Sequence, residues 1–136
     1  MTTFLLKIVT PDGLIYEGQA EKIIVRTISG DVAILARHIN YVAPLGMGQA
    51  VVVAGDGSRR TAACMGGMLS VINGDVDLVA TTFEWADKID LERAERAYDR
   101  ADKILKDSKS SDTDVNMAEA RLRRALVRKS VAKMKF

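Results

Sequence analysis

Charged side chains with the spacing of one helix face follow residue 89. Asp90, Arg93 and Arg100 are separated by three and seven residues, so a helix would carry one carboxylate and two guanidinium groups on one side. Guanidinium groups bind phosphate oxygens through paired, charge-assisted hydrogen bonds. The neighbouring Glu92 and Arg96 show that the same helix also carries ordinary exposed ion pairs. The spacing alone therefore favours a solvated charged face, with a phosphate-binding site as the alternative.

A second group of charges lies near the C-terminus. From Met117 onward, 7 lysine and arginine residues stand against 1 acidic residue. The basic residues surround much of one predicted helix: Arg121, Arg123, Arg124, Arg128, Lys129, Lys133 and Lys135. Such a helix indicates an acidic partner, either a protein surface or a nucleic acid. Residues 99–135 contain no aromatic side chain that could stack on bases, which weakens the nucleic-acid interpretation.

No arrangement of residues indicates catalysis or a metal site. His38 is the only histidine, and the sequence offers no evident partner for a metal site or nucleophile for it to activate. Cys64 lies among apolar neighbours, which favours a small buried thiol over a nucleophile. Gly66 and Gly67 are not followed by Gly-Lys-Ser/Thr, so close packing of the backbone within a strand is favoured over a phosphate loop. We expect no catalytic residues, no metal ligands and no enzyme activity from this chain by itself.

Length and charge limit the architecture to one ordinary domain with an appendage. The chain has 136 residues, of which 48% are hydrophobic, and a formal net charge of +2. Residues 1–88 contain 7 basic and 9 acidic residues, whereas residues 89–136 contain 13 basic and 9 acidic ones. The apolar runs are too short to cross a bilayer and no signal peptide is evident, so we expect a soluble, non-secreted protein. The single cysteine fits a reducing compartment.

The first part of the chain has the sequence pattern of short strands separated by turns. Turn residues such as Pro11-Asp12-Gly13 and Asn73-Gly74 divide apolar runs, and the second pair is a strong hairpin signal. About eight strands are predicted, at 4–9, 14–17, 22–27, 32–35, 49–54, 59–65, 68–72 and 75–80, with a long connection over 36–44. This spacing predicts an antiparallel β-sandwich over residues 1–86, with a barrel as the close alternative. The absence of helical pattern in residues 1–82 excludes a parallel α/β fold.

The second part, residues 87–136, has the pattern of a two-helix antiparallel hairpin. Asp90 is placed as the N-cap of a helix that continues to about Lys106. Apolar residues form one stripe on each helix: Leu91, Ala94, Tyr98, Ala101 and Leu105 on the first, and Val115, Ala118, Leu122, Ala125 and Ala132 on the second. Lys129 interrupts the second stripe. Alanine buries little apolar surface, so we expect the hairpin to depend on docking and to be able to open.

Several motifs, taken in their order, resemble the epsilon-subunit family of bacterial F-type ATP synthases over essentially the whole chain. The residues are Val9-Thr10-Pro11-Asp12-Gly13 with Tyr16 and Gly18, then Gly30-Asp31, His38, Pro44-Leu45, Gly66-Gly67-Met68-Leu69-Ser70-Val71 and Asn73-Gly74-Asp75-Val76. Ile89-Asp90-Leu91-Glu92-Arg93-Ala94 fits the family's ATP-binding pattern Ile/Leu-Asp-x-x-Arg-Ala. At Ala36-Arg37-His38 the family usually has Pro-Gly-His, so the resemblance does not predict the shape of that loop.

The resemblance implies a rotor subunit in the central stalk. The sandwich would bind the gamma subunit and rest on the c-subunit ring, with candidate contacts at Asp31, His38, Tyr41 and Pro44. It would couple proton or sodium flow to ATP synthesis at the cytoplasmic face of the bacterial plasma membrane, as a peripheral component without nucleic acid. In an extended state the hairpin would reach the alpha and beta subunits and block ATP hydrolysis. Candidate beta contacts are Arg121, Arg123, Arg124, Arg128 and Lys129.

The resemblance also implies a regulatory ligand, although no cofactor is required. In ATP-binding relatives, ATP, alone or with magnesium, clamps the folded hairpin. The matching positions are Glu84, Ile89, Asp90, Arg93, Ala94, Arg100, Arg124 and Arg128. Two other functions stand as alternatives: a basic nucleic-acid-binding module and a free nucleotide sensor.

Overall fold

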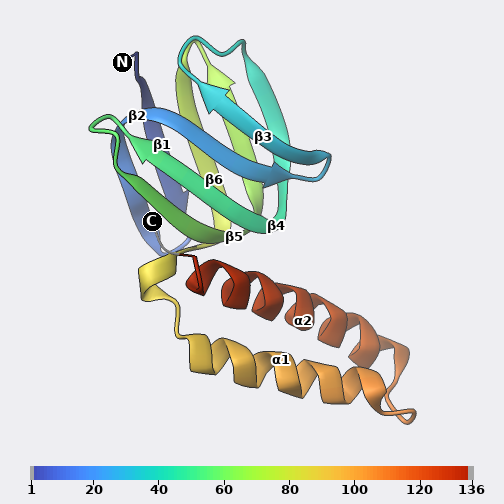
Figure 1. Cartoon of the computed structure of the whole chain (residues 1–136). Coiled ribbons are helices and arrows are strands. Elements are labelled where there is room, and N and C mark those ends of the chain that lie inside the picture. Colours follow the sequence, from blue (N-terminus) through green and yellow to red (C-terminus); the bar gives the residue numbers. More distant parts are fainter. Residues whose placement is uncertain (1, 135–136) are drawn as a thin grey trace.

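Six strands precede two α-helices in this computed structural model, which describes residues 2–134 (Figure 1). The strands are β1 Phe4–Thr10, β2 Gly13–Thr27, β3 Gly30–Leu35, β4 Tyr41–Ala54, β5 Arg59–Ile72 and β6 Asp75–Trp85. A short 3-10 helix η1 (Ala86–Lys88) leads to α1 (Leu91–Lys106) and α2 (Asp112–Ala132). The predicted fold class is confirmed. Lys135, counted with the basic residues, lies outside the described residues.

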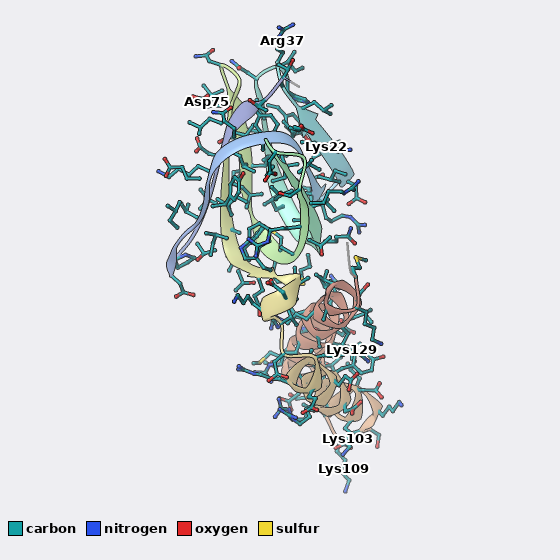
Figure 2. All side chains as sticks on the ribbon, turned by 60° about the vertical axis from the view of Figure 1, so that its left-hand side comes forward. Lys22, Arg37, Asp75, Lys103, Lys109 and Lys129 are labelled. Atoms are coloured by element: carbon teal, nitrogen blue, oxygen red, sulfur yellow. The ribbon has the colours of Figure 1, made fainter. Side chains whose placement is uncertain are left out.

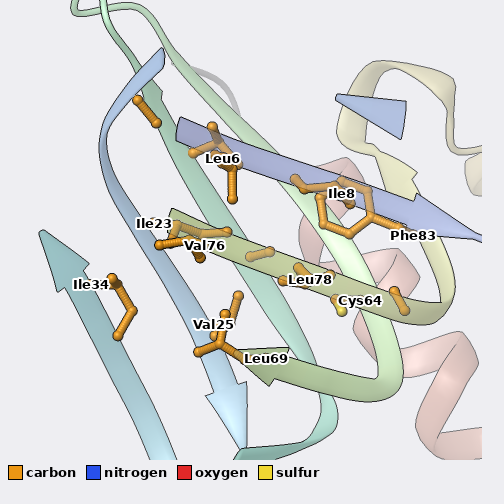
Figure 3. Packing of buried hydrophobic residues seen from close by; sticks show 14 of the residues in the cluster. Leu6, Ile8, Ile23, Val25, Ile34, Cys64, Leu69, Val76, Leu78 and Phe83 are labelled. Atoms are coloured by element: carbon orange, nitrogen blue, oxygen red, sulfur yellow. The ribbon is translucent and has the colours of Figure 1, made fainter. Parts of the chain in front are cut away.

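The strands form one sheet that closes on itself. Their order is β1-β6-β5-β4-β2-β3, and β1 also pairs with β2, so a ring of five strands encloses the core and β3 extends it. All pairs are antiparallel except β1 with β6, where Leu6 lies opposite Val76. Figure 3 shows Leu6, Ile8 and Leu78 among the fully buried side chains between the layers. Their removal from water supplies the main stabilisation of this domain.

The prediction of about eight strands is wrong, because several strands are longer than their apolar runs. The ranges 14–17 and 22–27 both lie within β2, and 59–65 and 68–72 both lie within β5. The connection predicted over 36–44 ends before Tyr41, so Pro44 lies inside β4. There the carbonyl of Pro44 accepts a hydrogen bond from the N–H of Ile28, at 3.2 Å. Residues expected to separate strands lie inside them instead.

The bend in β5 depends on Gly66 and Gly67, whose φ angles are +76° and +126°. Before the bend Cys64 faces the core, and after it Leu69 does, although strict alternation would place these two on opposite faces. A Cβ on Gly67 would overlap the carbonyl oxygen of Val79 on β6. The prediction of close backbone packing at this glycine pair is therefore confirmed.

Cys64 is a buried thiol, as expected, with 3% of its surface exposed. Burial raises the pKa of Cys64 from 9.0 to about 12, because the thiolate would lose its hydration. The folded state therefore keeps this proton where the unfolded state releases it, and stability falls as the pH rises from 9 towards 12. Between pH 8 and pH 10, Cys64 should lower the free energy of unfolding by about 1.4 kcal/mol. We expect this decrease to be absent in Cys64→Ala. Urea unfolding of both proteins at the two pH values would measure it; equal losses would contradict the burial argument.

The two helices begin where capping residues stand. The Asp90 carboxylate accepts a hydrogen bond from the Arg93 N–H at 3.0 Å, and Ser111 forms a capping box with Asp114. Alanines form the buried part of the seam: Ala94 and Ala101 on α1, Ala118 and Ala125 on α2. Figure 1 shows α2 between the sandwich and α1.

A second apolar face of α2 attaches the hairpin to the sandwich. Val131, which is 1% exposed, packs on Ala63 and Met65 of β5, and Val127 joins the same cluster. The predicted stripe contains neither valine, because it follows the face of α2 that meets α1. The hairpin is therefore docked mainly through the last turns of α2.

Candidate functional site

The end of β6 and the two helices enclose a pocket of about 330 Å³ at the junction of sandwich and hairpin. Glu84 comes from β6, Lys88 and Ile89 from the joint, and Arg128 from α2. The first turns of α1 supply the remaining lining residues, which are Arg93, Ala94, Ala97 and Arg100, beside the N-cap Asp90. The pocket thus has walls from three separate parts of the chain.

Strand alternation directs Glu84 into this pocket. Phe83 and Trp85 contribute to the sandwich core, so Glu84 points to the opposite side, where α2 lies. The Arg128 Nε donates a hydrogen bond to Glu84 Oε1 at 2.6 Å, with 28% and 36% of the two side chains exposed. This ion pair links residues 44 positions apart and joins the hairpin to the sandwich.

The structure brings together seven of the eight residues predicted to bind a nucleotide. Glu84, Ile89, Asp90, Arg93, Ala94, Arg100 and Arg128 line the pocket. The eighth, Arg124, lines an adjacent cavity of about 380 Å³ between α1 and α2, which also includes Arg100 and Arg128. The prediction did not include Lys88, Ala97 or Arg121. Ala97 lies one turn after the motif, and Arg121 belongs to the basic residues of the last helix, which the sequence had assigned to a different contact.

The lining suits the binding of an anion. Lys88, Arg93, Arg100 and Arg128 supply four positive charges, against the carboxylates of Glu84 and Asp90. The N-terminus of α1 adds the positive end of its helix dipole. Ile89 and Ala94 give a small apolar surface beside these charges, and the volume lies within the range of small-molecule sites. The residues present therefore fit a phosphate-bearing ligand with an apolar ring.

The four residues proposed to contact other rotor subunits lie in two places. Asp31 pairs with Arg26 (Nε to Oδ1, 2.6 Å), and that hydrogen bond lowers the pKa of Asp31. Asp31 and Pro44 both lie near the β2–β3 turn. The His38 and Tyr41 rings meet edge to face at 5.6 Å, at the start of β4.

Figure 2 places Arg37 and Asp75 at the end of the sandwich far from the helices. The loop that carries His38 therefore lies at the opposite end from the hairpin.

The basic residues proposed to contact a beta subunit have intramolecular neighbours in the docked hairpin. Arg128 pairs with Glu84, and the Lys129 Nζ lies 4.4 Å from the centre of the Tyr98 ring. Lys129 interrupts the predicted stripe because its side chain covers Tyr98 on α1. Arg121 and Arg124 line the cavity between the helices, and Arg123 faces the sheet. An acidic partner could engage all five only after these contacts are released.

Two family models together match nearly the whole chain. Residues 3–86 match the model described as "ATP synthase, Delta/Epsilon chain, beta-sandwich domain". Residues 87–133 match "ATP synthase, Delta/Epsilon chain, long alpha-helix domain". The chain belongs to the delta/epsilon chain family of ATP synthases.

Bacterial relatives place it with the epsilon chains. The ATP synthase epsilon chain of Bacillus velezensis is 45% identical over 132 residues, covering 97% of this chain and 98% of the relative. That of Ruminococcus albus is 41% identical over 136 residues, covering 99% and 100%. The resemblance found in the sequence is confirmed.

Chains in two solved ATP synthase complexes share the fold. A chain in the Euglena gracilis mitochondrial ATP synthase OSCP/F1/c-ring complex superposes with a TM-score of 0.85 at 21% identity, covering 96% of this chain and 81% of that one. A chain of the Tetrahymena thermophila central stalk and c-ring gives 0.61 at 14% identity, covering 95% and 96%. Within residues 2–134, neither α-helix of this epsilon-family chain combines the length and apolarity needed to span a bilayer.

Proposed function

We propose that this epsilon-family chain is a non-catalytic rotor subunit whose hairpin switches between a docked and an extended state. The sandwich would bind gamma and the c-ring and couple proton or sodium flow to ATP synthesis. The extended hairpin would reach alpha and beta and inhibit ATP hydrolysis, while ATP, alone or with magnesium, would favour the docked state. The complex would hold the chain peripherally at the cytoplasmic face of the bacterial plasma membrane.

The observation that supports the switch is the composition of the junction pocket. Glu84 belongs to the sandwich, Arg93 and Arg100 to α1, and Arg128 to α2. If the hairpin leaves the sandwich, the pocket no longer exists, so a ligand that contacts all three parts binds only the docked form. By mass action, ATP at a hundred times its dissociation constant would stabilise that form by about 2.7 kcal/mol.

The contacts that hold the hairpin are few enough for such a contribution to decide its position. Val131 is the one residue of α2 that is buried against the sheet, and the Glu84–Arg128 pair is only partly shielded from water. A partly exposed ion pair contributes about 1 kcal/mol or less. Ligand binding would therefore be comparable in size with the intrinsic docking energy.

The dimensions of the helices are compatible with the extended state. At about 1.5 Å per residue, α1 and α2 are roughly 24 and 32 Å long. Opening the hairpin would carry Arg128 and its basic neighbours by tens of ångströms, far enough to meet an acidic surface on a second subunit. Extension would also release Arg128 from Glu84 and Lys129 from Tyr98.

Calorimetric titration with ATP tests the ligand proposal, with Arg93→Ala as the test variant and Arg96→Ala as its control. Arg93 lines the pocket, whereas Arg96, on the same helix, is not part of its lining and pairs with Glu92 at 3.9 Å. We expect Arg93→Ala to weaken ATP binding at least about tenfold, the loss of a charged hydrogen bond, and Arg96→Ala to leave it nearly unchanged. No heat at millimolar ATP, or unchanged binding in Arg93→Ala, would refute the ligand proposal.

Copurification distinguishes the rotor proposal from a free nucleotide sensor. As a rotor subunit, the tagged chain should retain gamma and the c-ring from its native membranes after mild extraction. A free sensor would bind ATP yet retain no ATP synthase subunit. This result does not depend on the titration, so the two parts of the proposal can fail separately.

A further inference from the structure

A third cavity, of about 590 Å³, lies between α2 and the outer face of the sheet. It shares Arg128 with the junction pocket and Arg124 with the cavity between the helices, but otherwise has its own lining. One wall comes from β4, β5 and β6, and the other from α2. The proposed nucleotide function makes no use of the sheet wall.

The sheet wall is apolar. Met47 and Met65 supply it, and Met47 lies directly opposite Met65 in the β4–β5 register. Gly66, which lines the same cavity, has no side chain to fill it. Methionine side chains are flexible and polarisable, and adapt to apolar ligands of differing shape. This wall therefore suits a hydrocarbon chain.

The helix wall is cationic and its charges are incompletely paired. Arg123 and Arg124 line the cavity, and neither is paired with a carboxylate among residues 2–134. Arg128, the third guanidinium, pairs with Glu84 outside this cavity. Arg124 is partly buried, and a partly buried cation without a counter-ion has lost hydration that nothing replaces. Arg123 is exposed, so the two unpaired guanidinium groups are together available to one anionic group beside the apolar wall.

The Thr82 hydroxyl adds a further unsatisfied group. Thr82 lines the cavity and lies opposite Met65 in the β5–β6 register. Its Oγ1 is buried and has no hydrogen-bond partner among the described residues. A buried donor without a partner has lost its hydrogen bonds to water, a loss that a ligand oxygen within its reach would offset.

We propose that this cavity binds a small amphipathic carboxylate. The acyl chain lies along Met47 and Met65, and the carboxylate lies between Arg123 and Arg124. A single carboxylate matches two unpaired guanidinium groups, whereas a polyphosphate would find more cations in the junction pocket. Because its walls come from the sheet and from α2, the ligand stabilises the docked hairpin independently of ATP.

NMR titration of the full chain with decanoate, which stays monomeric at millimolar concentration, tests this site. We expect saturable shifts of the Met47 and Met65 methyl groups and of the Thr81 and Thr82 amides. The double variant Arg123→Ala with Arg124→Ala should bind decanoate at least about tenfold more weakly. The unaltered protein should bind the uncharged decanol more weakly than decanoate by a similar factor. Arg96→Ala on the outside of α1 is the matched control and should leave the affinity unchanged.

The outcomes separate this site from the nucleotide proposal. Decanoate binding that persists in Arg93→Ala supports an independent site, even if ATP fails to bind. Displacement of decanoate by ATP in simple competition would overturn the proposal, since one site would then serve both ligands. Shifts that do not saturate, equal binding of decanol, or an unchanged affinity in the double variant would also overturn it. The comparison with decanol needs no substitution, so it stands even if a variant fails to fold.

Discussion

Val131→Asp is expected to release the hairpin while the sandwich stays folded. Val131 is 1% exposed and packs on Ala63 and Met65, so the substitution places a carboxylate in an apolar contact without a partner. An uncompensated buried charge costs on the order of 3–5 kcal/mol, which exceeds what the few docking contacts supply. Hydrogen exchange should show lost protection in α1 and α2 and unchanged protection in β4, β5 and β6.

Leu126→Asp is the matched control for this release. Leu126 lies on the same helix, is 53% exposed, and undergoes the same change from an aliphatic side chain to a carboxylate. We expect it to leave hairpin protection nearly unchanged. If both variants lost protection equally, general weakening of α2 rather than undocking would be the cause. If neither did, Val131 would not hold the hairpin.

Gly67→Ala is expected to destabilise the sandwich more than the same methyl addition at Gly57. The new Cβ would overlap the Val79 carbonyl oxygen and lie 2.7 Å from the Ala80 Cα, both in the backbone of β6. The φ of +126° is also unfavourable for an L side chain. Backbone cannot move aside as a side chain can, so we expect a loss of about 3 kcal/mol or more in urea unfolding.

Gly57→Ala is the control that distinguishes the steric clash with β6 from the backbone strain of a positive φ. Gly57 also has a positive φ, +86°, but a Cβ there would meet no atom within 4 Å. Gly57→Ala should therefore lower the free energy of unfolding by only about 1 kcal/mol, the cost of the positive φ. Equal losses at the two positions would show that φ alone limits Gly67 and that the close approach of β5 and β6 is unimportant.

Local signals explain the parts of the fold that the sequence predicted correctly. The start of α1 followed from Asp90, because capping depends on a few neighbouring residues. The turn at Asn73-Gly74 followed from its backbone preferences, and both residues have positive φ. Each feature is determined within a few residues of itself.

Features that depend on distant parts of the chain were not predicted. A bent strand and two short strands have the same pattern of apolar runs, so β2 and β5 were each divided. Val131 was missed because a helix stripe shows that a face is buried but not which partner buries it, and α2 has two partners. The decisive contacts, with Ala63 and Met65, come from residues far away in sequence.

The candidate site was predicted partly for the same reason. The segment from Ile89 to Ala94 is continuous in sequence, so its motif identified one wall of the pocket. Glu84 and Arg128 came from the family resemblance, since nothing local links residues 44 positions apart. The cavity beneath Arg123 has no motif, and only the packing of α2 on the bent sheet reveals it.

ATP binding and the position of the hairpin are expected to be coupled. Distance measurement by spin or fluorescent labels tests it most directly, with labels on Asp75→Cys in the sandwich and Lys109→Cys at the hairpin tip, both exposed and both in Figure 2. Cys64 is buried and will react slowly by comparison.

We predict two distance populations without ATP and one docked population with it. Arg93→Ala should abolish the ATP response, and Arg96→Ala should preserve it. A single docked distance that is the same with and without ATP, and in both variants, would contradict the switch.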